Sequence, residues 1–358
     1  MKSLWNANKH LVYEKWKKYW FDTHPPDIAE YSWNYLFTGG KQIRPTLFCE
    51  LQHYFSPDSN EIHYDLAFAI ECIHVASIIL DDTPWMDNAE LRRGKVTLHK
   101  QFTPKKACLI AYDLLYLAIN IWNNYQPSTI NKEEWKQLLK GKLQRLMIGQ
   151  WYDLDKKGSL VELASLKTGV LFELVAETVA VLSNLDRTFW RQWGNNLGVL
   201  FQWMDDWDDR EEDKEQENRN AFNENYEITL YRYYYLWDSL VLGIGKSWFQ
   251  SEFGKYIESY FVGMEGFPKQ IFAIRKKELS LSEQLSYPEK FEIPEELWSL
   301  GKEKPNPKSK KYRSGFQFIN GKDMIKYLWM YIEQSESCPD YRYLWSKQES
   351  EWETIVSN

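Results

Sequence analysis

The chain is 358 residues long, 44% hydrophobic and 27% charged, which is typical of a globular protein with a large core. Its formal net charge of −7 argues against a general nucleic-acid binder. Its four cysteines show neither a CxxC pair nor metal-ligand spacing, which favours a reducing compartment without disulfides or zinc. No stretch reaches the roughly 20 apolar residues of a membrane-spanning helix, and the N-terminus lacks an apolar signal segment. We therefore expect a cytoplasmic protein that does not span a membrane.

Helical periodicity dominates residues 1–285. Gly and Pro lie mainly between the periodic stretches, and strand-like alternation is scarce. The pattern predicts an all-α bundle over 1–285, followed by a C-terminal extension over 286–358 in which prolines cluster with charged residues. Apolar residues recur at three- and four-residue spacing in the stretches Leu66–Asp82, Lys106–Trp122, Glu134–Asp155, Val161–Leu182 and Thr188–Asp209.

A first acidic motif, DDTPWMD at residues 81–87, ends the first of these stretches. Pro84 disfavours helical geometry at the residue before it, so the helix should end there and Asp87 can fold back toward Asp81. Clustered carboxylates raise each other's pKa unless a cation offsets them, and Mg²⁺ commonly bridges carboxylates to substrate phosphates. Arg92 and Arg93 supply guanidinium groups for phosphate oxygens. Taken alone, the motif is also compatible with a solvated acidic loop after a helix.

A second acidic motif, FQWMDDWDD at residues 201–209, closes another apolar stretch. At 100° per residue, Asp205, Asp208 and Asp209 share one helix face. Such a face would be costly to bury without a cation. Two acidic clusters that each end an apolar helix predict one metal-binding region.

Six motifs in this order resemble those of the trans-isoprenyl diphosphate synthases, the family of farnesyl and geranylgeranyl diphosphate synthases. The resemblance covers about residues 35–235 and implies an isoprenoid synthase-type helical bundle around a central apolar cavity, in a homodimer. The motifs are GGKQIRP (39–45), ECIH (71–74), DDTPWMD followed by LRRGK (81–95), GQWYDL (149–154), KTG (167–169) and FQWMDDWDD (201–209).

The resemblance also assigns site residues. It implies magnesium ligands at Asp81, Asp82, Asp87, Asp205 and Asp209. It implies an isopentenyl diphosphate site at Lys41, Arg44, His74 and Arg93, and an allylic diphosphate site at Arg92, Lys167, Thr168 and Gln202. The residues expected to act in the chemistry itself are Asp81, Asp82, Asp87, Lys167 and Asp205.

The reaction implied by the resemblance is the magnesium-dependent condensation of isopentenyl diphosphate with an allylic diphosphate. In this family the residues four and five before the first acidic motif form the floor of the product cavity, and here these are Ser77 and Ala76. A small floor favours geranylgeranyl diphosphate as the product, with farnesyl diphosphate next.

The chain departs from the family pattern near the second motif and before the first. Leu80 stands where the family has histidine. If Thr229 is aligned with the family's threonine, Glu227 occupies the position of a diphosphate-binding lysine, with Arg219 near a second lysine and Arg232 close by. The alternatives are a class I terpene cyclase, which would have no use for the isopentenyl site, and a non-catalytic partner subunit of a prenyl synthase. A ferritin-like di-metal bundle would need Glu-x-x-His ligand sets paired with further Glu ligands, and we find no such pairing.

Overall fold

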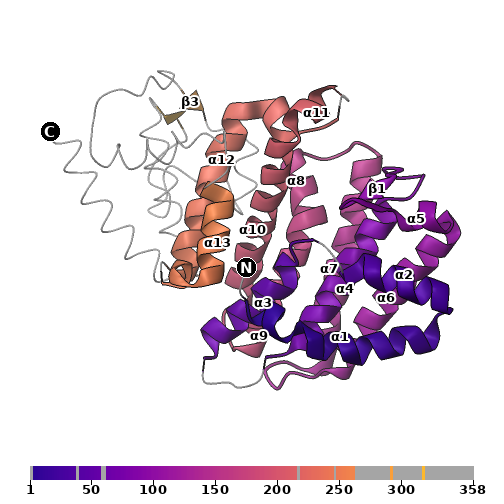
Figure 1. The fold of residues 1–358 in the computed structure, drawn as a ribbon. Helices are drawn as coiled ribbons and strands as arrows, with labels where there is room; N and C mark the ends of the chain where they lie inside the picture. Colours follow the sequence, from indigo (N-terminus) through magenta and orange to yellow (C-terminus); the bar gives the residue numbers. More distant parts are fainter. Residues whose placement is uncertain are drawn as a thin grey trace. The chain divides into compact units, whose positions relative to one another are not determined.

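Helices make up almost all of the structure in the computed structural model, which describes residues 3–37, 40–57, 62–215, 218–245 and 247–262 (Figure 1). The all-α prediction is confirmed for these residues. Of the proposed extension over 286–358, only two residue pairs are described, and they form the antiparallel strands β3 (Phe291–Glu292) and β4 (Gln317–Phe318). The rest of the extension lies outside the described residues, so the boundary at 285/286 stays a prediction.

All five predicted helical stretches are present, and the stretch 161–182 is divided by a π-helical turn at Ser165–Gly169. A short hairpin, β1 (Leu91–Arg92) and β2 (Lys95–Val96), follows the first acidic motif. Among the described residues, no helix has the length and apolar character needed to cross a membrane. The helices are α1 Leu4–Thr23, α2 Pro26–Phe37, α3 Ile43–Phe55, α4 Tyr64–Asp81, α5 Leu98–Gln101, α6 Pro104–Asn124, α7 Lys132–Leu154, α8 Leu160–Ala164, α9 Val170–Leu182, α10 Arg187–Asp208, α11 Arg210–Glu215, α12 Ala221–Ile244 and α13 Glu252–Val262, with a 3₁₀ turn at Trp248–Gln250.

The chain divides into two compact units. The first comprises residues 1–202 with 251–253, and the second comprises residues 203–250 and those from 254 on. The boundary falls within α10, directly after Gln202.

Side-chain caps explain where several helices of the first unit begin. Thr103 accepts a hydrogen bond from the backbone N–H of Lys106 and is followed by proline at the first position of α6. Asn131 accepts from the backbone of Glu134 at the start of α7, at 2.9 Å. Each cap satisfies a backbone donor that the helix itself leaves unbonded, and each contributes about 1 kcal/mol.

The core of the first unit is built around α4 and α9, which are buried along most of their length. Both helices are apolar nearly all round, as expected of helices enclosed by other helices. Aromatic side chains join the surrounding helices. Trp122 of α6 and Trp135 of α7 stack with ring centroids 4.1 Å apart, and each indole N–H donates to the other residue's backbone oxygen. Part of the chain's high tryptophan content therefore serves packing.

The second unit has a separate aromatic core between α12 and α13. The hydroxyl of Tyr233 donates to the backbone oxygen of Phe261 at 2.9 Å, and Trp237 lies 5.4 Å from the Phe261 ring. Gly254 permits close packing here, since a Cβ at that position would lie 2.2 Å from the backbone oxygen of Trp248.

Candidate functional site

The first acidic motif lies where α4 ends at Asp81, as predicted. After Thr83 the chain turns back, and the backbone N–H of Asp87 donates to the backbone oxygen of Asp81 at 2.9 Å. This turn brings the first and last residues of the motif together, and the charge of Asp87 raises the pKa of the Asp81 carboxyl group.

The Asp81 carboxyl group is held in a partly desolvated position. Gln150 of α7 donates to its Oδ1 at 2.6 Å. Burial raises the pKa of Asp81 to about 6, against the opposing charge of Lys167 and with a further rise from Asp87. The pKa of Asp87 is raised by burial as well. It is costly to ionise both carboxyl groups at the same time, and a bound cation would offset that cost. The pair is therefore an electrostatic site for a cation.

Lys167 supplies the positive charge beside these carboxylates. Its Nζ donates to Oδ2 of Asp153, a residue of α7. Although burial works to lower it, the pKa of Lys167 is raised by the carboxylates of Asp81 and Asp153. The motif GQWYDL was noted from the sequence without roles for Gln150 and Asp153. Their spacing of three residues, which puts both on one face of a helix, was the signal available.

Asp82 faces a different set of partners from Asp81. It is buried, its Oδ2 accepts from the hydroxyl of Tyr35 at 2.7 Å, and its Oδ1 accepts from Nε and Nη2 of Arg92 at 2.9 and 2.7 Å. Both carboxylate oxygens are therefore bonded within the protein. Arg92 Nη2 also lies 3.9 Å from Oδ2 of Asp87. Among the aspartates of this motif, Asp82 holds Arg92 in place, while Asp81 and Asp87 form the acidic pair.

The LRRGK segment forms the β1–β2 hairpin, which sequence patterning did not predict. Its two turn residues, Arg93 and Gly94, both have positive φ, at 53° and 74°, as in the tight turns that connect short antiparallel strands. The turn brings Arg93 against Gly40, where an added Cβ would lie 2.4 Å from the guanidinium carbon. Gly40 has φ of 73°, so its backbone conformation favours glycine.

The structure brings three of the four residues predicted for isopentenyl diphosphate into one region. Burial lowers the pKa of His74 well below its usual range, and the charges of Arg44 and Arg93 lower it further. The Arg44 guanidinium lies over the ring of Phe172, with its carbon 4.7 Å from the ring centroid. The fourth residue, Lys41, is exposed just before α3. The charges of Arg44 and Arg93 beside the His74 imidazole suit the binding of an anion.

Glu71 is a buried acid in the same region to which the sequence gave no role. Burial raises its pKa, against the charges of Arg44 and Arg93. The residue belongs to the ECIH motif, so the motif itself was the signal.

The last two residues of the predicted allylic site also meet. The hydroxyl of Thr168, in the π-helical turn, donates to Oε1 of Gln202 at 2.8 Å. Because Thr168 follows Lys167 directly, the turn carries two of the four residues predicted for this diphosphate.

The aspartates of the second acidic motif lie in the second unit, at the end of α10. Asp205, Asp208 and Asp209 are exposed, which agrees with their predicted common face. The hydroxyl of Tyr260 donates to Oδ1 of Asp205 at 3.3 Å. Asp206 differs from the other three, since its Oδ2 accepts from the backbone N–H of Ala221 at the start of α12, at 3.1 Å.

The acidic residues of the first motif fit part of the donor set of a magnesium ion. In the described part of the chain, no three His, Cys, Asp or Glu side chains are grouped closely enough to hold a metal ion by themselves. Mg²⁺ in phosphate-processing sites is usually bound by one or two carboxylates together with phosphate oxygens and water. Asp81 and Asp87 match that smaller donor set.

The remaining residues named from the sequence are those of the expected cavity floor and those near the second motif. Ala76 is fully buried in α4, and Ser77 donates its hydroxyl to the backbone oxygen of His74 at 2.8 Å. Arg219 pairs with Glu224, with Nε 2.9 Å from Oε1. The side chains of Glu227 and Arg232 lie outside the described residues.

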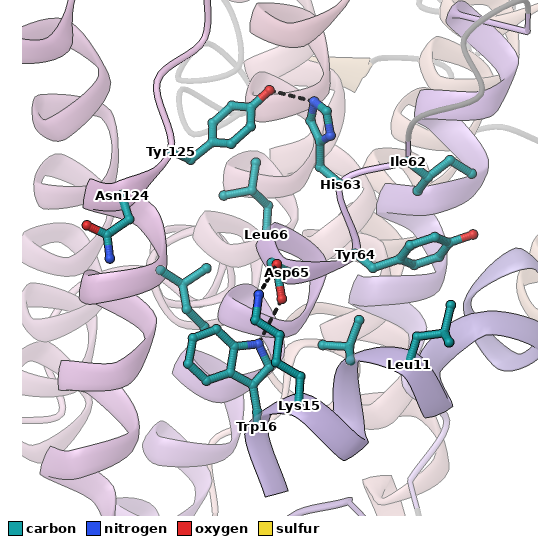
Figure 2. A pocket seen from close by; sticks show the side chains of 12 residues that line it. Leu11, Lys15, Trp16, Ile62, His63, Tyr64, Asp65, Leu66, Asn124 and Tyr125 are labelled. Carbon is teal, nitrogen blue, oxygen red and sulfur yellow. Dashed lines mark hydrogen bonds and ion pairs between the residues drawn. The ribbon is translucent and has the colours of Figure 1, made fainter. Parts of the chain in front are cut away.

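A cavity of about 550 Å³ opens at the other end of α4 (Figure 2). Asp65, in the first turn of α4, accepts from Lys15 at 2.7 Å and from the indole of Trp16 at 2.8 Å at this cavity. Across it, His63 and the hydroxyl of Tyr125 are 2.5 Å apart. None of the predicted site residues lines it.

Comparison with known proteins gives consistent matches. The family model described as polyprenyl synthetase matches residues 26–226, more than half of the chain. Geranylgeranyl diphosphate synthase of Pseudescherichia vulneris is 33% identical over 199 residues, covering 51% of this chain and 64% of that protein. Farnesyl diphosphate synthase of Geobacillus stearothermophilus is 32% identical over 185 residues, covering 48% and 62%. The chain thus spans less than two thirds of the length of these curated relatives.

One solved structure extends the comparison to the fold. A FPP/GFPP synthase from Zymomonas mobilis matches with a TM-score of 0.56 and 26% identity, covering 69% of this chain and 96% of that chain. The match agrees with the isoprenoid synthase-type bundle expected from the sequence.

Proposed function

This chain belongs to the polyprenyl synthetase family, and we propose that it is a magnesium-dependent short-chain prenyltransferase that joins isopentenyl diphosphate to an allylic diphosphate. The observation that carries the proposal is the cluster at the end of α4. Two partly desolvated carboxyl groups, Asp81 and Asp87, lie under the influence of the charge of the half-buried Lys167. Such a cluster is costly to the fold and useful to a cation–diphosphate complex.

The allylic diphosphate would be bound by donors from three elements. Lys167 and Thr168 come from the π-helical turn and Gln202 from α10. Arg92 comes from the hairpin and is held by Asp82, which we therefore assign to positioning rather than to metal binding. Asp81 and Asp87 would hold the magnesium ion together with the phosphate oxygens.

Magnesium bound there would offset charge on the departing diphosphate. On the family resemblance, we propose that Asp205 and Asp209 also contribute to magnesium binding.

The isopentenyl diphosphate would be bound by Lys41, Arg44, His74 and Arg93. Because its pKa is lowered, His74 stays neutral and offers one donor and one acceptor. The guanidinium groups of Arg44 and Arg93 supply the charge that the diphosphate needs.

The chemical step requires no side-chain nucleophile. The bond between the allylic carbon and the diphosphate oxygen breaks, and the electron pair leaves with the diphosphate. The double bond of isopentenyl diphosphate supplies the electrons for the new carbon–carbon bond. This leaves a cation on the neighbouring carbon of the isopentenyl unit. A proton is then lost from the carbon between that cation and the diphosphate-bearing carbon, which restores a double bond, and the departing pyrophosphate accepts it. The protein's contribution is to orient both substrates, bind the developing charge and exclude water.

We propose geranylgeranyl diphosphate as the product, with farnesyl diphosphate second. The support is Ala76, a fully buried small residue five positions before the first motif. On a helix this places it about 7.5 Å along the axis from Asp81. Replacing Ala76 with tyrosine should shorten the main product, because bulk added to a packed region is poorly accommodated. Chromatography of the dephosphorylated products tests this, and an unchanged product distribution would contradict it.

The proposed partner is a second copy of this chain. Large exposed apolar surfaces mark interaction sites. In a two-fold dimer, the same surface of each copy packs against that of the other. The Trp122–Trp135 stack joins α6 to α7, and both helices carry exposed apolar side chains. Those side chains are Leu109, Tyr112 and Tyr116 on α6, and Met147, Ile148, Trp151 and Leu154 on α7.

Light scattering on the eluted protein tests the dimer. Leu109→Arg should shift the mass toward that of a monomer. Leu11→Arg, a similarly exposed leucine on α1, serves as the matched control and should leave the mass unchanged. A monomeric wild-type protein would contradict the proposal.

A cytoplasmic location is likewise a proposal, and it rests on the sequence.

The activity itself is tested with radiolabelled isopentenyl diphosphate and geranyl or farnesyl diphosphate as the primer, with and without Mg²⁺. Magnesium-dependent incorporation of label is expected. A hydrocarbon formed from the allylic diphosphate without isopentenyl diphosphate would indicate a terpene cyclase. No turnover and no binding of either substrate would overturn the proposal.

A further inference from the structure

The turn that carries Lys167 and Thr168 is π-helical rather than α-helical. Such turns are rare and are frequent at functional sites. The position of this turn depends on the side chains that contact it. The residues that fix Ser165–Gly169 would therefore control where Lys167 and Thr168 point.

Asn195 of α10 contacts both ends of this turn. Its Oδ1 accepts from the hydroxyl of Ser165 at 2.9 Å, and its Nδ2 donates to the backbone oxygen of Ser165 at 3.3 Å. At the other end, a Cβ added to Gly169 would lie 2.8 Å from Nδ2 of Asn195. One buried side chain thus spans the first and last residues of the turn.

Glu173 fixes the orientation of this amide. Nδ2 of Asn195 donates to Oε2 of Glu173 at 3.0 Å. A carboxylate only accepts hydrogen bonds, so the NH₂ group must face Glu173 and the amide oxygen must face the Ser165 hydroxyl. Glu173 is itself buried and is held by Lys142 and by Arg145, whose Nη1 lies 2.6 Å from each carboxylate oxygen. The buried charge is therefore paired and its position is set from α7.

Glycines allow α10 to approach the turn closely enough for these bonds. A Cβ at Gly198 would lie 2.5 Å from Cα of Gly169, so the two backbones are in direct contact. One turn earlier, a Cβ at Gly194 would lie 2.5 Å from the backbone oxygen of Phe172. Asn195 lies between these two close approaches and is hydrogen-bonded to the turn.

We propose that Asn195 is a positioning residue for diphosphate binding, which holds the π-helical turn and thereby aims Lys167 and Thr168. The inference rests on the proposed function, because it assumes that these two side chains bind the allylic diphosphate. Asn195 itself touches no substrate. It acts on the turn from α10, and Glu173 keeps its amide in the required orientation.

Two measurements on the full-length protein test the inference. Hydrogen–deuterium exchange follows the amides of residues 165–169, and calorimetry follows the binding of inorganic pyrophosphate in the presence of Mg²⁺. In Asn195→Ala, exchange in the turn should rise, and pyrophosphate affinity should fall about tenfold, the equivalent of one or two net hydrogen bonds. In steady-state assays the KM for the allylic primer should rise more than the KM for isopentenyl diphosphate.

Asn196→Ala is the matched control on the same helix. The Asn196 side chain is half-buried, and its Oδ1 accepts from Gln192 at 2.8 Å. Asn196→Ala therefore removes the same amide group as Asn195→Ala, but breaks a hydrogen bond within α10 instead of those to the π-helical turn. It should leave exchange and affinity unchanged. Ser32→Ala, which removes the Trp20–Ser32 hydrogen bond in the same unit, controls for a general loss of stability. If Asn195→Ala does not fold, Ser165→Ala removes one of the same bonds and should give a smaller change of the same kind.

The two parts of the idea fail in different ways. Unchanged exchange in Asn195→Ala would overturn the claim that Asn195 holds the turn. Faster exchange with unchanged pyrophosphate affinity would overturn its link to diphosphate binding. Wild-type protein that binds no pyrophosphate would overturn the proposed function, while the exchange data would still decide the structural claim.

Discussion

The two acidic motifs read almost alike in sequence but have different environments. In the first, burial raises the pKa of Asp81 to about 6 and raises that of Asp87. In the second, Asp205, Asp208 and Asp209 are exposed at the end of α10. Burial and neighbouring acids raise the pKa of Asp209 as well. The three side chains of the second cluster nevertheless remain exposed to water, so the first cluster is the more strongly desolvated of the two.

The two motifs share a division of roles among their aspartates that the sequence does not reveal. In the first adjacent pair of aspartates of each motif, the second residue serves the fold. Asp82 binds Tyr35 and Arg92, and Asp206 accepts from the backbone of Ala221 at the start of α12. Neighbouring aspartates in one motif can thus have different roles, structural or ligand-binding, depending on the groups that each side chain contacts.

The largest expected effect is on turnover. Asp81→Asn should lower prenyl transfer by about a hundredfold or more, because a metal-bridging carboxylate contributes several kcal/mol to the transition state. Asp205→Asn should also lower it substantially. Asp208→Asn, on the same exposed face as Asp205 but outside the proposed ligand set, is the control and should keep most of the activity. Near-normal turnover of Asp81→Asn would remove the first motif from the proposed site.

The second effect is on stability and separates the two structural aspartates. Asp82→Asn should lower the free energy of unfolding by about 2–3 kcal/mol, since it breaks a buried ion pair whose arginine is partly exposed. Asp206→Asn keeps an oxygen that can accept from Ala221, so its cost should be about 1 kcal/mol or less. Urea unfolding measures both. Equal costs would mean that the Arg92 pair adds no more to stability than the backbone contact.

A smaller effect concerns pH. The pKa of Asp81 is about 6 in the folded protein against an ordinary value of 3.8, so its ionisation is resisted by the fold. Its contribution to stability is fully present below pH 3.8 and is lost as the pH rises through 6. Without magnesium, wild type should therefore lose about 2 kcal/mol relative to Asp81→Asn between pH 4 and pH 7.

Denaturant titrations at several pH values measure this difference. The exposed Asp208→Asn control should run parallel to wild type across the range. Curves for wild type and Asp81→Asn that are parallel throughout would contradict the desolvated state of Asp81.

The local features of the fold followed from the sequence. Apolar spacing predicted the long helices, and Pro84 predicted both the end of α4 and the return of Asp87 toward Asp81. These outcomes depend on residues that are neighbours along the chain. The family motifs added the fold and a list of expected site residues.

Contacts between distant residues could not be predicted in the same way. Tyr35 lies 47 positions from Asp82, and Asn195 lies 30 positions from Ser165. No spacing rule connects such pairs. The π-helical turn was hidden inside a stretch that appeared continuously helical. Glycines within helical patterns, such as Gly194 and Gly198, were the available signal of close packing.

The central claim is that Asp81 and Asp87 bind a divalent cation together with a diphosphate. Electron paramagnetic resonance with Mn²⁺, which also prefers oxygen ligands, tests it directly when inorganic pyrophosphate is added to wild type and to an Asp81→Asn/Asp87→Asn variant. We predict that pyrophosphate increases the protein-bound Mn²⁺ in wild type and does so far less in the variant. Equal amounts of pyrophosphate-dependent bound Mn²⁺ in the two proteins would contradict the claim.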